Sequence, residues 1–216
     1  GWGAIFYPKK FISFIKKLKK GNNILVTFDE MQAGFARTGK PFGFEHYDIK
    51  PDIVCCGKGM GGGLPLSGVL SSAKIMNLAD KGSMSSTHSA NPLACAAGIA
   101  VLHEIKKNNL IRKADKLGNY LFLRLTKIKN KYPNKIFSIQ GKGLIASIIF
   151  DKNDKNYLFN IGSIVEECFY SGLLLVYTGR ESIKIGPPLS ITYNALKEGL
   201  DILEMSIDKK YKKTNN

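Results

Sequence analysis

Short apolar runs alternate with helix-like segments through the first half of the chain. Residues 8–20 place Phe11, Ile15 and Leu18 at helical spacing, which puts the intervening lysines on the expected solvent face. The runs Ile24–Phe28 and 52–56 are too short for buried helices and are separated by a long connection. They therefore predict parallel strands that are buried on both faces.

The middle of the chain carries two predicted helices. Glycines 61–63 and a proline break the chain before a further apolar run over 66–70. Asn91 followed by Pro92 is typical of a helix start, with an N-cap and then a proline at the first helical position, and this helix is expected to reach about Lys107. A second helix is predicted over 110–131, because its apolar residues form one stripe: Leu110, Ala114, Leu117, Leu121 and Ile128.

The second half follows a different order, β-β-α-β-β-α. Its predicted elements are strands near 136–140 and 143–150, a helix near 158–171, strands near 173–177 and 182–186, and a final helix that Thr192 caps. The apolar stripe of the final helix is Leu196, Leu200, Leu203 and Ile207. This order suits a small sheet covered by helices. We therefore expect an α/β chain whose boundary lies inside or just after the 110–131 helix, giving domains 1–118 and 119–216.

The net charge of +15 changes this picture little. The chain has 216 residues with 32 basic and 17 acidic side chains, and only four of the basic ones are arginine. The lysines cluster at 9–20 and 209–213, on a helix pattern and on a polar tail, without the arginine forks and interleaved aromatic residues of a nucleic-acid protein. A solvated lysine face is favoured. A non-enzymatic basic nucleic-acid-binding module stays as an alternative class.

Cysteine usage and hydropathy exclude several other classes. Cysteines 55, 56, 95 and 168 suit neither a disulfide scaffold nor a zinc site, because no C-x-x-C pair or suitably spaced histidine accompanies them. No apolar stretch approaches the roughly 20 residues of a membrane span, and the first ten residues lack a secretory pattern. We expect a cytoplasmic protein with reduced thiols, no metal, and no membrane or nucleic-acid partner.

Two predicted strands end in ionisable groups, Asp29 and Lys58, which lie about one crossover unit apart. Ligands bind beyond the carboxyl ends of the strands in open α/β sheets. A lone carboxylate and a lone lysine at neighbouring strand ends suit pyridoxal phosphate, because the lysine forms a Schiff base with it and the acid keeps its pyridine nitrogen protonated. On spacing alone, the alternative stays open that Asp29 is a turn residue and Lys58 a solvated surface group.

The surrounding residues resemble a known family. The segment LVTFDEMQAGFARTGKPFGFEHYDIKPDIVCCGKGMGGGLPLSGVL is similar to the signature block of the class III pyridoxal-phosphate aminotransferases, and SMSSTHSANPLACAAGIAVL and SIKIGPPLSIT resemble later segments of that family. The resemblance covers essentially the whole chain. It implies the C-terminal part of the fold type I large domain over 1–118 and the complete small α+β domain over 119–216. It also implies transfer of an amino group from an amino acid or amine donor to an oxo acid, through pyridoxamine phosphate.

This resemblance assigns roles to four residues. Asp29 matches the acid at the pyridine nitrogen, and Lys58 matches the Schiff-base lysine that also moves the Cα proton. Gln32 matches the residue near the phenolic oxygen of the cofactor. Thr87 matches the threonine that reaches the cofactor phosphate of the neighbouring subunit, which implies a homodimer with shared active sites.

Other motif residues are interpreted as structural. Gly34 and Arg37 match motif positions, and the glycines 61–63 are expected to serve tight turns and close backbone approach. Packing is the favoured role of the histidines, which stand at positions 46, 88 and 103.

Two departures from the family pattern matter. Lys184 stands where the family usually has an arginine that forks onto a substrate carboxylate, and lysine supplies only a point charge. Arg180 substitutes if both residues lie on one face of a single strand, so both are candidate substrate-binding residues and the two substrates stay unassigned. The chain also begins with Gly1-Trp2-Gly3, which resembles a point midway through the large domain. We therefore expect a fragment that binds the cofactor weakly or not at all by itself.

Two other enzyme classes remain to be weighed. An ATPase interpretation of the strand before Glu30 lacks the G-x-x-x-x-G-K-[ST] loop that it requires. The nearer alternative is an aminomutase of the same superfamily, of the glutamate-1-semialdehyde type, whose members resemble D-E-V-M where this chain has Asp29-Glu30-Met31-Gln32. Gln32 therefore favours transamination.

Overall fold

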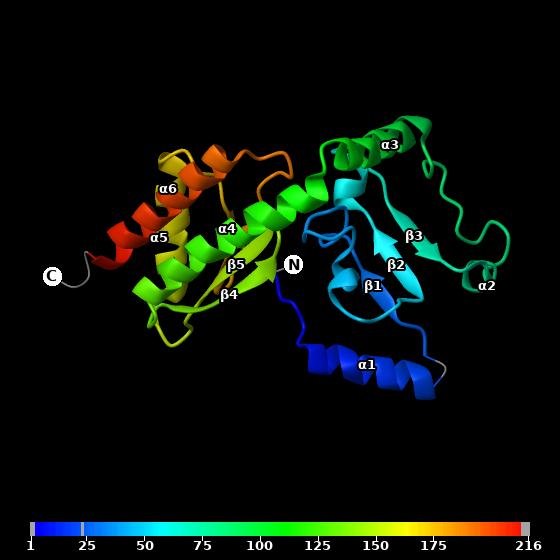
Figure 1. Cartoon of the computed structure of the whole chain (residues 1–216), viewed down its shortest axis with the longest axis horizontal. Coiled ribbons are helices and arrows are strands. Elements are labelled where there is room, and N and C mark those ends of the chain that lie inside the picture. Colours follow the sequence, from blue (N-terminus) through cyan, green and yellow to red (C-terminus); the bar gives the residue numbers. More distant parts are fainter. Residues whose placement is uncertain (1–2, 23, 213–216) are drawn as a thin grey trace. The chain divides into compact units, whose positions relative to one another are not determined.

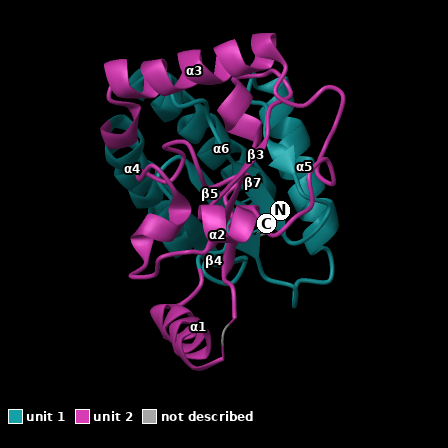
Figure 2. Ribbon diagram, turned by 90° about the vertical axis from the view of Figure 1, so that its right-hand side faces the viewer, with its two compact units in different colours: residues 1–6, 113–216 teal, residues 7–112 magenta. Residues whose placement is uncertain are grey.

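The computed structural model describes residues 3–22 and 24–212, which form two compact units (Figure 1). Unit 2 comprises residues 7–112, and unit 1 comprises residues 1–6 and 113–216 (Figure 2). The helix α4 (Leu110–Lys131) begins in unit 2 and continues into unit 1. The expected boundary after residue 118 falls in this same helix, and the functional names given to the two domains stay predictions. Gly1 and Trp2, on which part of the family resemblance rests, lie outside the described residues.

Unit 2 is built around a three-stranded sheet in the order β1-β2-β3. Its elements in chain order are α1 (Lys9–Gly21), β1 (Thr27–Asp29), the 3-10 helix η1 (Gly43–His46), β2 (Ile53–Cys56), the 3-10 helix η2 (Lys58–Gly61), β3 (Gly68–Ser71), α2 (Ala73–Met76) and α3 (Pro92–Lys107). β1 and β2 run parallel, as predicted, and β3 is antiparallel to β2. A short link through η2 and a glycine turn allows this reversal, whereas a parallel neighbour needs a longer crossover, usually a helix.

The predicted burial of the strands on both faces is wrong for β1. Thr27 and Asp29 are exposed, and the preceding Ile24 and Leu25 are 45% and 50% exposed. A parallel strand is buried on both faces only where other layers cover both sides of its sheet. The exposure of β1 shows that the described part of unit 2 does not supply both layers.

The helix α1 has nearly the predicted extent, but the face of the helix that is buried differs from the predicted one. Ile12 is buried, whereas Phe11, which belongs to the expected stripe, is exposed. Lys19 is part of the reason, because its Nζ lies 2.8 Å from Asp52 Oδ1 and ties that side of the helix to the start of β2. The lysine face of α1 is therefore solvated only in part.

Unit 1 is a four-stranded antiparallel sheet in the order β4-β5-β7-β6, with helices packed on one face. After α4, its elements are β4 (Ile136–Lys142), β5 (Ile145–Phe150), α5 (Tyr157–Tyr170), β6 (Val176–Tyr177), β7 (Ser182–Ile185) and α6 (Tyr193–Lys212). This sequence of elements confirms the predicted β-β-α-β-β-α order. Figure 2 shows these elements in teal.

The core of unit 1 forms where the predicted helix stripes meet alternate residues of the sheet. The buried stripes of α4 and α6 are Ala114, Leu117, Leu121 and Ile128, and Leu196, Leu200, Leu203 and Ile207. From β5, Ala146, Ile148 and Phe150 belong to this core at the period of two of one strand face, while Ile145 and Ser147 of the other face are buried as well. The predicted cap of α6 is also present, since Thr192 Oγ1 accepts a hydrogen bond from Ala195 N–H at 3.2 Å.

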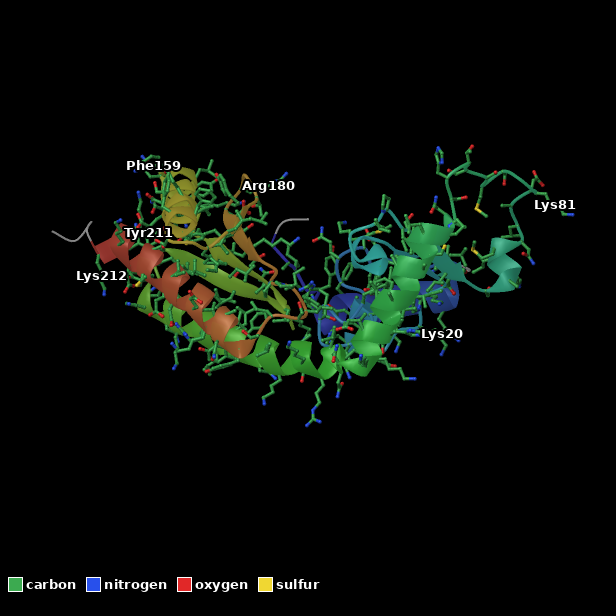
Figure 3. All side chains as sticks on the ribbon, turned by 90° about the horizontal axis from the view of Figure 1, so that it is seen from above. Lys20, Lys81, Phe159, Arg180, Tyr211 and Lys212 are labelled. Carbon is green, nitrogen blue, oxygen red and sulfur yellow. The ribbon has the colours of Figure 1, made fainter. Side chains whose placement is uncertain are left out.

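The lysines near the C-terminus belong to α6, not to a polar tail as expected. Lys209 Nζ lies 2.7 Å from Glu167 Oε2 of α5. Lys210 Nζ lies 4.5 Å from the ring centroid of Phe159, which Figure 3 labels on α5. These contacts give the lysines partners within unit 1, whereas Lys213 lies outside the described residues.

We predict that Leu121→Ala lowers the free energy of unfolding of unit 1 by about 2–5 kcal/mol, because it leaves a cavity in the core of the unit. Leu123, two residues further along α4, is 54% exposed and provides the matched control. Leu123→Ala is expected to change stability by less than about 0.5 kcal/mol. Denaturant unfolding of both variants measures the difference, and equal losses would contradict the described packing of α4.

Candidate functional site

Asp29 and Lys58 lie at the ends of two paired strands. β1 ends at Asp29, whose Cα partner across the parallel pair is Cys55 of β2, and Lys58 follows three residues later as the first residue of η2. The backbone N–H of Glu30 donates to Cys55 O at 2.9 Å, which extends the pairing one residue beyond β1. Figure 1 shows the two strands next to each other in unit 2. The carboxyl ends of these strands therefore meet at one edge of the sheet, where ligands bind in α/β folds.

Both side chains are accessible at this edge. Asp29 and Lys58 are each exposed. One oxygen of Asp29 serves a turn, since Oδ1 accepts a hydrogen bond from Met31 N–H at 2.9 Å. Lys58 has a φ of +47°, in the left-handed region that a non-glycine residue rarely occupies. Strain of this kind is retained where the surrounding structure imposes it, and it is concentrated at functional sites.

Gly57 brings the two strand ends into close contact. It is buried and extended, with a φ of 179°, so its backbone conformation does not require glycine. A Cβ added at Gly57 would collide with Sδ of Met31, which follows β1. A larger residue at Gly57 would therefore require the flexible end of the Met31 side chain, which packs on the backbone before Lys58, to move.

The buried carboxylate of Glu30 holds the segment that follows β1 against the end of that strand. Glu30 is 2% exposed. Its Oε2 accepts from Gly43 N–H at 2.8 Å and its Oε1 from Phe44 N–H at 2.7 Å. Burial raises the pKa of this carboxyl group, and the two backbone hydrogen bonds oppose that rise. The carboxylate thus closes the loop 30–46 onto the end of the strand.

Gly34 and Arg37, two loop residues of the family motif, have the close packing and burial of structural residues. A Cβ at Gly34 would lie 2.9 Å from the carbonyl oxygen of Glu30 and 3.2 Å from Cδ1 of Phe42, so only glycine fits there. Arg37 is half-buried, and this burial lowers its pKa. Gln32, the candidate for the phenolic oxygen, is half-buried on the same loop.

The glycines 61–63 have the expected turn role. Gly62 and Gly63 have φ values of +59° and +112°, which favour glycine. A Cβ at Gly62 would also lie 2.8 Å from Cγ2 of Val101 of α3, and one at Gly61 would lie 3.1 Å from Cβ of Leu66. The positive φ of Gly62 and Gly63, and close packing of Gly62 against α3 and of Gly61 against Leu66, therefore account for this cluster.

The remaining predicted residues of unit 2 lie outside this edge or in exposed positions. Thr87 is exposed in the segment between α2 and α3. His46 is half-buried, with Nε2 3.1 Å from both the carbonyl and hydroxyl oxygens of Thr38, as expected for a packing residue. The packing role expected for His88 and His103 is wrong, because both are exposed.

The two candidate substrate-binding residues belong to unit 1. Lys184 is half-buried in β7, where its Cα partners are Ser147 of β5 and Val176 of β6. Arg180 is exposed in the bend before β7 (Figure 3). The two residues do not share a strand, so the condition under which Arg180 replaces Lys184 on one strand face fails. Because the site edge of Asp29 and Lys58 lies in unit 2, the role of both residues stays a prediction.

Glu30 is the residue of this edge to which the sequence assigned no function. It directly follows Asp29, but its partners are backbone amides 13 and 14 residues further along, which no side-chain motif records.

Within residues 3–22 and 24–212, no group of three or more His, Cys, Asp or Glu side chains is arranged to hold a metal ion. In the same ranges, no helix is both long and apolar enough to cross a membrane.

Comparisons with known proteins agree on one family. A family model described as Aminotransferase class-III matches residues 2–207. A leucine/methionine racemase from Thermococcus litoralis is 36% identical over 208 residues, covering 95% of this chain and 47% of the relative. An acetylornithine aminotransferase from Clostridium acetobutylicum is 32% identical over 206 residues, covering 95% and 51%. A solved ornithine aminotransferase from Plasmodium yoelii has a TM-score of 0.88 at 30% identity, covering 96% of this chain and 54% of that one.

The chain spans about half the length of the curated relatives it matches. That share fits the expectation of a fragment of the family fold. The racemase is slightly more similar than the aminotransferase, so overall similarity does not choose between their two reactions.

We predict that Gly57→Ala destabilises unit 2 by about 1 kcal/mol, the low end of the usual cost of overpacking, because the added Cβ meets only the flexible end of Met31. Removing the obstacle in the double variant Gly57→Ala/Met31→Ala is expected to recover part of that loss relative to the sum of the single variants. Gly21→Ala is the control, because a Cβ there meets nothing within 4 Å. Denaturant unfolding provides the measurement, and strict additivity of the two single effects would contradict the contact between Gly57 and Met31.

Proposed function

Because the chain belongs to the class-III aminotransferase family, we propose that it carries the lysine and the acid of a pyridoxal-phosphate site for transamination between an amino donor and an oxo acid. Class III aminotransferases depend on pyridoxal phosphate, and the structural neighbours of this chain include fold type I enzymes of that class. The supporting observation is the parallel register of β1 and β2, which puts Asp29 and the Gly57-Lys58 turn at one sheet edge. Family membership replaces the ATPase and nucleic-acid interpretations.

The residues at this edge fit the cofactor in chemistry and in access. Asp29 and Lys58 are both exposed. Two groups that bind the same molecule must be accessible to it before it binds. The cofactor, when bound, supplies an electron sink for the carbanion at the substrate Cα. Asp29 would hold the ring-nitrogen proton through a charge-assisted hydrogen bond of about 1.5–3 kcal/mol. Lys58 Nζ would attach the cofactor, accept the Cα proton and return it.

Gln32 is proposed to complete the cofactor contacts within the chain. It lies on the loop that Glu30 closes onto the end of β1, three residues after Asp29. A side-chain amide can donate to a phenolic oxygen. This donation would stabilise negative charge on that oxygen while Asp29 keeps the opposite side of the ring protonated.

The proposal extends to assembly and location. Thr87 is exposed between α2 and α3, which leaves its hydroxyl available to the cofactor phosphate of a second copy in a homodimer. The four cysteines are free thiols, which supports a cytoplasmic location. Shared sites of this kind would make activity depend on dimer formation.

Lys184 is proposed as the principal group for a substrate carboxylate, with Arg180 as a second candidate. Lys184 is half-buried in a strand, so its position is better defined than that of Arg180 in an exposed bend. A lysine binds a carboxylate as a point charge, without the bidentate geometry of arginine. The substrates are therefore proposed as an amino acid or amine donor and an oxo acid, with at least one carboxylate.

A second candidate function is amino-acid racemisation, favoured by the 36% identity to a leucine/methionine racemase. The same lysine and acid serve both reactions, because each begins with removal of the Cα proton. Racemisation returns the proton to Cα from the opposite face and releases no oxo acid. The aminomutase alternative is weaker, since Gln32 stands where that group resembles a methionine.

We predict that Lys58 binds the cofactor in preference to the other lysines. The chain is incubated with pyridoxal phosphate at a concentration well below saturation, reduced with borohydride and digested, and the adducts are quantified by mass spectrometry. Lys74 of α2 and Lys81 are exposed lysines of the same unit and serve as internal references. Asp29→Asn is expected to lower labelling of Lys58 roughly ten- to a hundredfold, the equivalent of the lost charge-assisted bond, and to leave the references unchanged. Equal labelling of all three lysines would contradict the proposed site.

The products then separate transamination from racemisation. A single amino acid is supplied with cofactor and an oxo acid, and chiral chromatography measures both enantiomers and the new oxo acid. Because the chain by itself is expected to bind the cofactor weakly, we expect only slow formation of a new oxo acid, which is lost in Lys58→Ala and kept in Lys74→Ala. Inversion of the amino acid without oxo-acid release would instead establish the racemase.

A further inference from the structure

The buried carboxylate of Glu30 connects three segments that meet at the proposed cofactor edge. Its two oxygens accept from Gly43 N–H and Phe44 N–H, and its own backbone N–H donates to Cys55 O of β2 at 2.9 Å. The loop 31–42, the end of β1 and the end of β2 therefore meet at this one residue. All of these contacts lie within unit 2.

The loop that Glu30 closes needs an anchor of this kind. Phe35 and Ala36 have φ values of +54° and +68°, in the left-handed region that non-glycine residues rarely occupy. Ala36 is also 1% exposed, so the strained conformation is held inside the unit. Without the carboxylate, the buried amides of Gly43 and Phe44 would lose their acceptors.

Packing around the carboxylate is tight enough to fix its position. A Cβ at Gly43 would lie 2.7 Å from Cβ of Ala33 and 3.2 Å from Glu30 Oε2, so the backbone there approaches the carboxylate closely. The ring of Phe44 lies 5.9 Å from that of Phe28 of β1, centroid to centroid, in an edge-to-face arrangement. The loop end is thus held to β1 by both hydrogen bonds and aromatic packing.

We propose that Glu30 is the positioning residue of the cofactor site: by holding the loop and both strand ends together, it sets the placement of Gln32, Asp29 and the Gly57-Lys58 turn. Met31, the next residue, passes this constraint to Gly57 by direct contact. The inference rests on the proposed function for its consequence at Lys58, whereas the clamp itself is a property of the chain without cofactor. Glu30 touches none of the reacting groups.

The electrostatic surroundings give the clamp a pH signature. The charges facing Glu30 are acidic, namely the preceding Asp29 at the end of β1 and Glu45 of η1, and the thiol of Cys56 of β2 is also close enough to interact. Burial is the main cause that raises the pKa of Glu30, and these two acids add to the rise. Protonation puts a hydrogen on one of the two accepting oxygens, so the backbone hydrogen bond to that oxygen weakens as the pH falls through this raised pKa.

The first measurement uses the chain without cofactor and needs no substitution. The amide shifts of Gly43 and Phe44 in ¹H–¹⁵N spectra are expected to titrate together, with a midpoint above the ordinary glutamate range. Glu45→Gln is the matched control, because Glu45 Oε1 accepts from Phe42 N–H at 2.9 Å in the same loop but is exposed. This control should leave both amides titrating. Gly43 and Phe44 amide shifts that follow no common titration while the chain stays folded would overturn the clamp.

The second measurement connects the clamp to Lys58. The ratio of reductive cofactor labelling at Lys58 to that at Lys74 is compared in Glu30→Gln, Glu30→Asp and Glu45→Gln. We expect at least a fivefold fall for Glu30→Gln, a smaller fall for Glu30→Asp, which keeps the charge, and no change for Glu45→Gln. An unchanged ratio in a folded Glu30→Gln chain would refute the positioning role. A chain that never prefers Lys58 would refute the proposed function instead and would leave the amide titration as the test of the clamp.

Discussion

The parallel pairing of β1 with β2 is the constraint on which the candidate site depends. It sets Asp29 opposite Cys55, and the Glu30 N–H to Cys55 O bond holds that register at the very end of the pair. Successive side chains of a strand point to opposite faces, so a slip of one residue would turn Asp29 to the other face. It would also separate Met31 from Gly57, whose contact leads directly to Lys58. The separation of the acid and the amine is thus a property of backbone pairing, before any ligand is present.

Around this pair, the chain combines exposed reactive groups with buried supports. Asp29, Lys58 and Thr87 are exposed, whereas Glu30, Gly34, Ala36 and Gly57 are buried. The buried residues make contacts that involve the backbone. Glu30 accepts from two backbone amides, Gly34 lies against a backbone carbonyl, and the side chain of Met31 packs against the backbone of Gly57. Such supports restrict the loop without contributing reactive atoms. This division explains how buried contacts can fix the surroundings of one lysine in a lysine-rich chain.

Sequence reasoning succeeded where a long periodic pattern met a single packing surface. The helices over 92–107 and 110–131 and the start of α6 were predicted closely, because stripes such as Leu117, Leu121 and Ile128 have only one way to be buried, whereas residues 209–212 of α6 were expected to be a polar tail. It was less successful where tertiary contacts decide: Ile12 replaced Phe11 on α1 because ion pairs turn that helix, and Arg180 fell in a bend outside β7. The family motif led to Asp29 and Lys58, but Glu30 could not be assigned, because its partners are backbone amides that leave no side-chain pattern.

The register of β1 and β2 can be measured without cofactor, substrate or substitution. Scalar coupling across hydrogen bonds in the ¹⁵N- and ¹³C-labelled chain reports which carbonyl accepts each amide proton. We expect coupling from Glu30 N–H to the carbonyl of Cys55, the bond of 2.9 Å that ends the parallel pair. Coupling from Glu30 to the carbonyl of Val54 or Cys56 would show a register shifted by one residue. The carboxylate and the amine would then not share one site, and the central claim would fail.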